Sequence, residues 1–306
     1  MNHRIDFGQF LRERFGGKRI QKITLSAGFT CPTRDGSTSR GGCTYCNVKS
    51  FSPAFHIRGK SITEQLSEGI AFFAHKYPEM QYIAYFQSYT NTYAAVGECI
   101  TKYEEALAYP GVVGLIIGTR PDCMPDELIS YLAELSKHTF VLIEYGVEST
   151  IDRTLVRVQR GHDWQTSVRT IERTHAAGIL TGAHLILGLP GESREDMLCH
   201  ADRLSTLPIT TLKVHQLQII KGTIMASEYL SRPTDFHLFT EEEYIELCLD
   251  FLERLRPDIV IERFVSQSPP EMLLAPRWGW KNYQFTHKIR IGLEKRLTQK
   301  HSTNRR

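Results

Sequence analysis

Apolar runs and amphipathic segments alternate along most of this chain of 306 residues. The apolar runs have the composition of buried strands and lie at residues 20–25, 81–86, 112–117, 140–143, 180–187, 211–218 and 259–264. Helical spacing of apolar residues is clearest at residues 61–77, 126–135, 164–177, 193–204 and 240–255. A strand that returns to a parallel neighbour needs a crossover of about this length, usually a helix. The alternation therefore predicts an α/β fold with a parallel sheet covered by helices.

Two architectures satisfy this alternation, a doubly wound sheet and a full or partial (β/α) barrel. The dinucleotide-binding version of the doubly wound sheet would carry G-x-G-x-x-G after a strand, and no such motif is present. In a barrel, functional side chains gather at the C-terminal ends of the strands. Six successive predicted strands carry or lead into polar residues, namely Cys31, Gln87, Ser88, Arg120, Glu148, His184, Lys213 and His215. We therefore expect a partial (β/α)6, TIM-like barrel whose strand ends form one mouth.

The predicted elements also suggest boundaries. We expect residues 1–18 to form a short N-terminal extension, residues 19–265 to form the barrel, and residues 266–306 to form a basic C-terminal extension.

The overall composition is typical of a soluble globular protein, with 41% hydrophobic and 23% charged residues. Seven cysteines are too sparse for a secreted disulfide scaffold. The first 17 residues lack the apolar core of a signal peptide, and no run of about 20 apolar residues could cross a membrane. These features predict a cytoplasmic protein without a membrane partner.

Positive charge is concentrated at the C-terminal end. Residues 281–306 contain eight Lys or Arg and one acid, Glu294, so this segment carries +7 while the whole chain carries +3. A basic terminal segment is typical of contacts with a phosphate backbone, although an exposed solvated helix has the same composition. An apolar face formed by Phe285, Ile289 and Leu293 would dock such a helix on the barrel.

Three cysteines lie close together near the N-terminus, in the run FTCPTRDGSTSRGGCTYCN. Cys43 and Cys46 form a Cys-x-x-Cys pair, and Cys31 lies upstream of them. Three thiolates suit a [4Fe–4S] cluster with one iron left open for a ligand. The alternative is zinc, with His56 as a fourth ligand. A catalytic disulfide pair fits less well, because that motif belongs where a strand enters a helix in a small βαβ domain.

Several further motifs accompany the cysteines. They are Thr119-Arg120-Pro121-Asp122, Gly146-Val147-Glu148-Ser149, residues 156–162 (VRVQRGH), residues 184–191 (HLILGLPG) and residues 273–278 (LLAPRW). Together with Cys43-Thr-Tyr-Cys46, they make the chain resemble a radical S-adenosylmethionine (SAM) enzyme. Within that superfamily, the chain more closely resembles the radical SAM domain of the Elongator catalytic subunit. It resembles the short bacterial YhcC/YtqA group more closely still. The resemblance spans roughly residues 20–300.

The resemblance implies a [4Fe–4S] cluster held by Cys31, Cys43 and Cys46, which cleaves SAM to methionine and a 5′-deoxyadenosyl radical. It implies SAM contacts from Tyr45 near adenine, Gln87 and Ser88 at the methionyl amine, and Glu148 at the ribose or amine. Arg160 would pair with the methionyl carboxylate and His184 would reach the adenosyl group. Arg120 and Lys213 would face the substrate. These assignments leave the catalytic residues unknown.

The implied substrate is a tRNA wobble uridine, and the implied partners are tRNA and an electron donor such as flavodoxin or ferredoxin. A small-molecule or protein substrate is the alternative. Two zinc proteins also remain open, a nucleic-acid-binding protein without redox chemistry and a barrel enzyme that uses zinc to activate water. The chain departs from the common Cys-x-x-x-Cys-x-x-Cys pattern, because eleven residues separate Cys31 from Cys43, as in Elongator-type proteins. It is too short for Elongator's acetyltransferase domain, so acetyl transfer is not implied.

Overall fold

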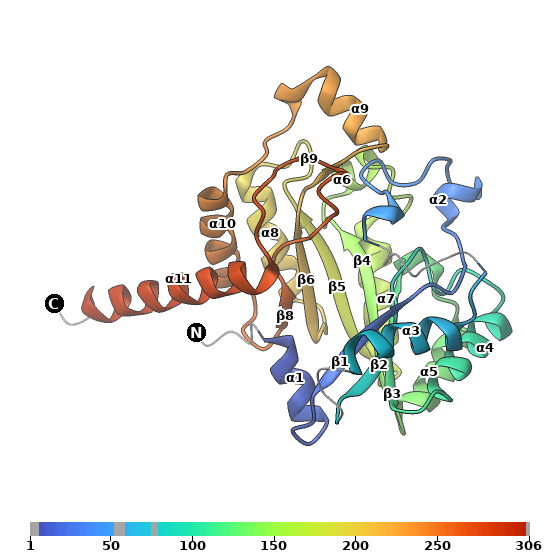
Figure 1. Ribbon diagram of the computed structural model, residues 1–306. Coiled ribbons are helices and arrows are strands. Elements are labelled where there is room, and N and C mark those ends of the chain that lie inside the picture. The colour runs from blue at the N-terminus through green and yellow to red at the C-terminus, as the bar shows by residue number, and fades with distance from the viewer. Residues whose placement is uncertain (1–5, 52–58, 75–78, 304–306) are drawn as a thin grey trace.

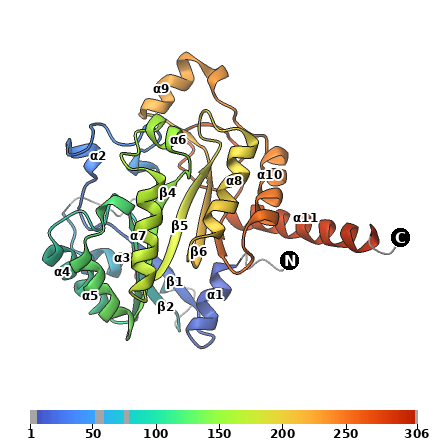
Figure 2. The same ribbon diagram turned by 180° about the vertical axis from the view of Figure 1, so that it is seen from behind.

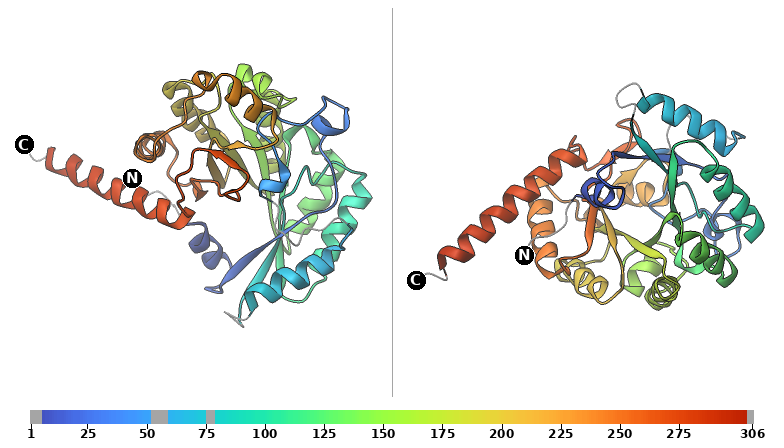
Figure 3. Two further views of the ribbon diagram at one scale, coloured as in Figure 1. Left: turned by 45° about the horizontal axis from the view of Figure 1, so that its top comes forward. Right: turned by 90° about the horizontal axis from the view of Figure 1, so that it is seen from below.

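The computed structural model describes residues 6–51, 59–74 and 79–303. Seven strands form one fully parallel sheet in the order β1-β2-β3-β4-β5-β6-β8. Their bounds are β1 (Ile20–Leu25), β2 (Gln81–Phe86), β3 (Val112–Thr119), β4 (Phe140–Glu148), β5 (Leu180–Leu187), β6 (Thr211–Gln216) and β8 (Val260–Arg263). The sheet is curled into an open half-barrel (Figures 1 and 3). The predicted partial barrel is confirmed, with β8 as a seventh strand beyond the six repeats expected.

Helices cover the convex side of the sheet. They are α3 (Ile62–Ala74), α4 (Val96–Leu107), α5 (Asp126–Ser136), α7 (Trp164–Ala176), α8 (Arg194–Ser205) and α10 (Glu241–Arg254). Figure 2 shows α7 and α8 in front of this outer face. Capping boxes at Ser193 and Thr240 begin α8 and α10, because each hydroxyl accepts a backbone N–H that the first helical turn would leave unpaired. The layer between helices and sheet contains the main apolar core.

The concave side is closed at the N-terminal ends of the strands by α1 (Phe7–Arg14). Phe7, Phe10 and Leu11 are buried there against inward side chains of the sheet, including Tyr85 and Leu142. Figure 3 shows this helix from below, lying across the interior of the half-barrel. Among the described residues, α1 therefore fills this end of the half-barrel with apolar side chains.

Short elements surround that other end. They are α2 (Pro32–Asp35), α6 (Asp152–Arg157), α9 (Ile224–Ser231) and a small antiparallel sheet of β7 (Ile219–Ile220) and β9 (Leu273–Ala275). In Figure 1 the cysteine-bearing loop around α2 and the helix α9 both lie at this end. No described helix is long and apolar enough to cross a membrane.

The C-terminal helix α11 (Asn282–Thr303) projects from the body of the protein (Figure 1). Its first half docks by Phe285 and Ile289, which are buried, and Leu293 packs partly against the same core. Farther along, the Arg296 guanidinium bonds Glu246 at 2.6 Å and Asp250 at 2.7 Å, both on α10. The predicted apolar face is thus present. Two of the eight basic residues of the tail form intramolecular ion pairs, Arg296 with α10 and Arg290 with Asp6 at 3.3 Å.

Docking of α11 should contribute strongly to stability. Phe285→Ala is expected to lower the free energy of unfolding by about 3–5 kcal/mol, because it leaves a cavity among Tyr244, Phe264 and Trp278. Tyr283→Ala is the matched control, since Tyr283 lies on the same helix and is 68% exposed; it should change stability by less than about 0.5 kcal/mol. Chemical denaturation measures both, and equal effects would contradict the docked helix.

Candidate functional site

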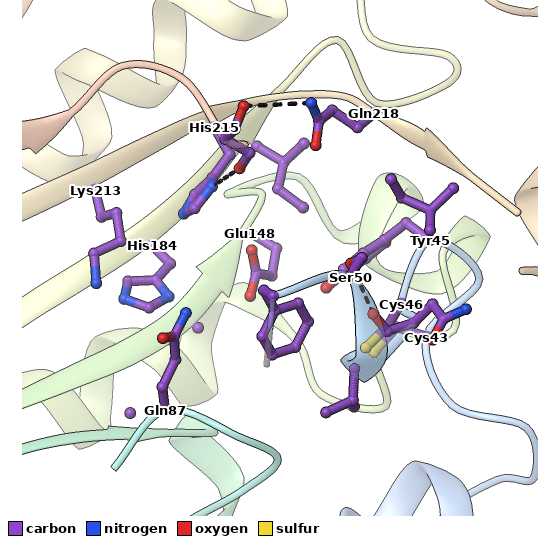
Figure 4. Close-up of a pocket in the computed structure, with 18 of the residues that line it drawn as sticks. Cys43, Tyr45, Cys46, Ser50, Gln87, Glu148, His184, Lys213, His215 and Gln218 are labelled. Carbon is purple, nitrogen blue, oxygen red and sulfur yellow. Dashed lines mark hydrogen bonds between the residues drawn. The ribbon is translucent and has the colours of Figure 1, made fainter. Parts of the chain in front are cut away.

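A cavity opens at the C-terminal ends of the strands and extends down inside the half-barrel (Figure 4). All three N-terminal cysteines line it. So do most of the other predicted site residues, namely Tyr45, Gln87, Arg120, Glu148, Arg160, His184, Lys213 and His215. The structure therefore brings together residues that are up to 184 positions apart in sequence, from Cys31 to His215.

Ser88 is the exception among the predicted site residues. Its side chain is buried, and it is not among the residues that line the cavity. Strand β2 ends at Phe86, so only Gln87 turns towards the cavity before the chain leaves the sheet. Thr90, two residues after Ser88, lines the cavity and contacts the sulfur of Cys31. The sequence analysis did not identify Thr90 as a site residue.

Backbone hydrogen bonds fix the cysteine loop on its surroundings. Cys31 precedes Pro32 at the start of α2, and the N–H of Cys46 donates to the carbonyl of Cys43 at 2.9 Å in a tight turn. Thr44 between them donates its N–H to the carbonyl of Val158 and accepts from the N–H of Met225. Both bonds tie the Cys-x-x-Cys turn to segments far along the chain, so the thiols have defined positions without a disulfide.

Each thiol has its own polar neighbour. The Thr90 hydroxyl lies 3.1 Å from the Cys31 sulfur as a donor, and Nη1 of Arg160 donates to the Cys43 sulfur at 3.6 Å. Arg34 donates to the carbonyl of Cys46 at 2.9 Å and also hydrogen-bonds its side chain. The three neighbours come from three different segments. Such an arrangement stabilises sulfur atoms that carry negative charge.

Burial nevertheless favours the neutral thiols. It raises the pKa of Cys46 to about 11, and the nearby Cys43 contributes to the rise while Arg34 opposes it. Burial likewise raises the pKa of Cys31, and the bond from Thr90 opposes that rise. A metal centre reverses this balance, because its positive charge deprotonates a coordinating thiol.

Two arginines present unpaired donors beside the cysteines. Arg160 donates from Nη2 to the carbonyl of Gly146 at 2.5 Å and lies 3.9 Å from the Glu148 carboxylate, while its Nε has no partner. Arg120 binds Asp122 and the carbonyl of Arg160, and its Nη1 has no partner. Both side chains are buried. Buried donors without partners are costly, so these two are well placed to bind an anionic group in the cavity.

Backbone strain is also concentrated here. Among the described non-glycine residues, positive φ occurs at Tyr89 (66°), Glu148 (68°) and Gln159 (54°). Tyr89 and Glu148 line the cavity, and Gln159 directly precedes Arg160. Each such residue costs about 1–3 kcal/mol and persists only where the surroundings impose it. The strain at Glu148 turns its carboxylate into the cavity at the end of β4 (Figure 4).

The floor of the cavity is a network of buried charges from the concave face of the sheet. Lys213 donates to Glu144 at 2.6 Å, to the Tyr85 hydroxyl at 2.8 Å, and lies 3.1 Å from Glu262. Lys22 lies 2.5 Å from the same Glu262 oxygen. Because its three N–H groups have these three partners, Lys213 anchors the floor of the cavity that it lines. That it faces the substrate stays a prediction.

His184 completes the floor. Its Nε2 lies 2.9 Å from the Glu144 carboxylate, and its ring centroid lies 5.8 Å from that of His215 in the same cavity (Figure 4). Burial raises the pKa of Glu144, but Lys213 and Lys22 lower it by more, so that it lies well below its ordinary value. Glu144 is therefore an ionised carboxylate deep inside the sheet.

The described residues hold no group of three or more His, Cys, Asp or Glu arranged around a single metal ion. This finding concerns sites in which the ligands surround one ion. In a cubane cluster each thiolate binds a different iron, so the three sulfurs need not surround a single point. His56, the suggested fourth zinc ligand, lies outside the described residues.

Comparisons with known proteins agree with this geometry. The sequence profile of the radical SAM superfamily matches residues 36–204, and that of the radical SAM C-terminal domain matches residues 209–295. The chain is 35% identical over 286 residues to the uncharacterized protein YtqA of Bacillus subtilis, covering 94% of this chain and 88% of that one. It is 36% identical over 274 residues to YhcC of Escherichia coli K12, covering 89% and 86%.

More distant similarities extend to archaeal proteins. A tRNA uridine(34) acetyltransferase of Methanocaldococcus infernus is 23% identical over 170 residues, which cover 53% of this chain and 30% of that protein. The solved structure of Elp3 from the same organism superposes with a TM-score of 0.67 at 17% identity, covering 90% of this chain and 63% of that one. The structural likeness shows the same fold.

The floor network predicts a pH-dependent stability. Burial lowers the pKa of Lys22 from 10.5 to about 8, although Glu262 opposes the shift. The folded protein therefore loses this proton before the unfolded chain does, and stability rises with pH between about 8 and 10.5. Relative to Lys22→Met, the wild type should gain about 2 kcal/mol of unfolding free energy between pH 7.5 and 10. Urea denaturation at several pH values measures this, and a pH-independent difference would contradict it.

Proposed function

The chain belongs to the radical SAM superfamily, and from this premise we propose that it is a tRNA-modifying enzyme that acts on a wobble uridine. Members of the superfamily use a [4Fe–4S] cluster and SAM. The observation that carries the proposal is the convergence of three thiols, each with its own polar neighbour, on a cavity at the strand ends of a half-barrel. The unpaired donors of Arg120 and Arg160 fit the anionic parts of these two cofactors.

In this proposal Cys31, Cys43 and Cys46 hold the cluster. When bound and reduced, it supplies the electron that cleaves SAM, so the protein itself contributes position, charge and exclusion of water. Thr90, Arg34 and Arg160 orient the sulfur ligands and stabilise their negative charge. A flavodoxin- or ferredoxin-type donor would supply the electron.

The SAM contacts follow from the residues that line the cavity. Gln87 suits the methionyl amine, since its carboxamide has no side-chain partner among the described residues and faces the cavity. Glu148 suits the ribose or the amine, and Tyr45 packs beside the apolar cluster near the loop, where adenine could stack. Arg160 suits the methionyl carboxylate. Its contacts to Cys43 and Gly146 use two of its five N–H bonds, so the Nε–H and the second hydrogen of each Nη remain for an anion.

Two observations support tRNA as the substrate. One relative is named as a tRNA uridine(34) acetyltransferase, although it shares only part of its length with this chain. The segment 281–306 carries +7, and its exposed Lys281 and Lys295 have no ion-pair partner among the described residues. Arg296 does not belong to this surface, because α10 holds it. Nucleoside mass spectrometry of tRNA from cells with and without the gene tests the proposal directly; identical nucleoside profiles would count against it.

The cluster assignment predicts the iron content. Anaerobically reconstituted protein should bind about four irons per chain, as one cubane requires. Replacing Cys31, Cys43 or Cys46 by Ala should abolish this binding. Cys199→Ala is the control, because Cys199 lies on α8 and does not line the cavity. Elemental analysis and the visible absorbance report the result, and a colourless protein with one zinc per chain would contradict the assignment.

The tRNA assignment predicts a charge-dependent affinity. Lys281→Glu/Lys295→Glu should weaken binding of bulk tRNA and reduce the slope of log affinity against log salt by about 0.7–0.9 for each lost phosphate contact. The control Lys18→Glu/Lys137→Glu changes the net charge by the same amount. Both lysines are exposed and precede β1 and β4, so they lie at the N-terminal ends of the strands, away from the cavity. Filter binding at several salt concentrations measures both. Equal effects of the two double variants would show that α11 makes no specific contact.

A further inference from the structure

The floor of the cavity contains hydrogen-bond acceptors that the proposed cofactor contacts do not use. Oε1 of Glu144 is buried and has no partner, although the carboxylate is ionised. His184 lies directly beside it, and 18% of its side chain is exposed. Both residues line the cavity. An unpaired ionised oxygen in a buried wall is costly unless a ligand supplies a donor nearby.

The contact between these two residues fixes the hydrogen of the His184 ring. An ionised carboxylate only accepts hydrogen bonds, so Nε2 of His184 must be the donor to Glu144. In the neutral ring this leaves Nδ1 with a free lone pair, and no described residue donates to it. Lys213 donates to the same Glu144 oxygen, Oε2, at 2.6 Å and holds the carboxylate in place. The chain Lys213–Glu144–His184 therefore presents an acceptor to the cavity.

Charge decides which kind of donor fits. Five cationic side chains and two carboxylates line the cavity. On the floor itself, Lys22, Lys213 and Arg263 outnumber Glu144 and Glu262. An ammonium group would add a further cation to this positive surface at close range, so a neutral N–H is favoured.

Donors line the same cavity as this acceptor. The Gln87 carboxamide has no side-chain partner among the described residues, so its NH2 group can donate to a second ligand while its oxygen accepts from the methionyl amine. Arg263 lines the cavity on β8, with 31% of its side chain exposed and only a 3.8 Å contact to Glu262. A ring that offers carbonyl oxygens next to an N–H would match this combination of donors and acceptor.

We propose that the floor recognises the imide edge of a uracil ring, with Nδ1 of His184 accepting the ring N–H and with Glu144 as the positioning residue for His184. This inference rests on the proposed function, and it assigns His184 to the substrate rather than to the adenosyl group. The base would enter from an unpaired loop, where single-stranded RNA exposes its Watson–Crick edge.

The test compares two synthetic anticodon stem–loops that are identical except for uridine or 3-methyluridine at the wobble position. Reconstituted full-length protein with SAM should bind the uridine RNA about tenfold more tightly, because 3-methyluridine has no imide N–H and leaves the acceptors unpaired. His184→Phe keeps a ring of similar size but removes the acceptor, so this ratio should fall towards one. Glu144→Gln should lower it as well. Fluorescence anisotropy at fixed salt measures each ratio.

Glu262→Gln is the matched control, since it removes one negative charge from the same network but contacts neither His184 nor the cavity. Its ratio should stay clearly above that of Glu144→Gln. A ratio of one in the wild type, or a ratio that survives in His184→Phe, overturns the inference while leaving tRNA as the substrate. Weaker SAM binding by His184→Phe with an unchanged ratio also overturns it, in favour of an adenosyl contact. Failure to bind either RNA overturns both the inference and the tRNA assignment.

Discussion

The buried ion network on the concave face of the sheet is the constraint on which the site depends. A parallel half-barrel has an inner surface that must be filled, and here α1 fills one end with apolar side chains while Lys22, Glu144, Lys213 and Glu262 occupy the next layer. These four residues come from strands β1, β4, β6 and β8. Buried charges are tolerated only when they are paired with good geometry, so the network favours one curvature of the sheet. That curvature sets the spacing of everything above it.

The cysteine loop depends on the same frame in a different way. It has little regular structure of its own and is fixed by backbone bonds of Thr44 to Val158 and Met225. The donors to the sulfurs arrive from the end of β2 and from the segment after α6. The loop can therefore hold its three cysteine sulfurs in place only when the strands are already paired in register. Assembly of the site thus depends on folding of the sheet.

The sequence predicted the strands well because they are fully buried apolar runs bounded by clear breaks. Strands β1, β2 and β5 have the bounds expected from residues 20–25, 81–86 and 180–187. Helix α4 was not predicted, since its N-cap residue Ala95 has no capping side chain and its first turn contains Gly97. The role of Lys213 could not be read from its position on a strand, because its three partners lie on β2, β4 and β8. Ser88 was misplaced because the strand ends two residues before it. Pairing across strands is a tertiary property that no local pattern carries.

The cavity divides along the sheet in a way that follows from this topology. The cysteine loop and Gln87 follow β1 and β2, and Glu148 ends β4. They supply the sulfurs, the free carboxamide and the strained carboxylate proposed to hold the cofactors. His184, His215 and Arg263 lie on β5, β6 and β8, and Ser266 follows them with bonds to the side chains of His215 and Gln216. Glu144 stands at the boundary, on the strand that ends in Glu148 and in contact with His184 from β5. A ligand bound near Glu148 and a ligand bound near His184 would therefore both lie against strand β4. Under the proposed function, this shared strand would bring the base next to SAM, and the paired charges of the floor would hold both in position.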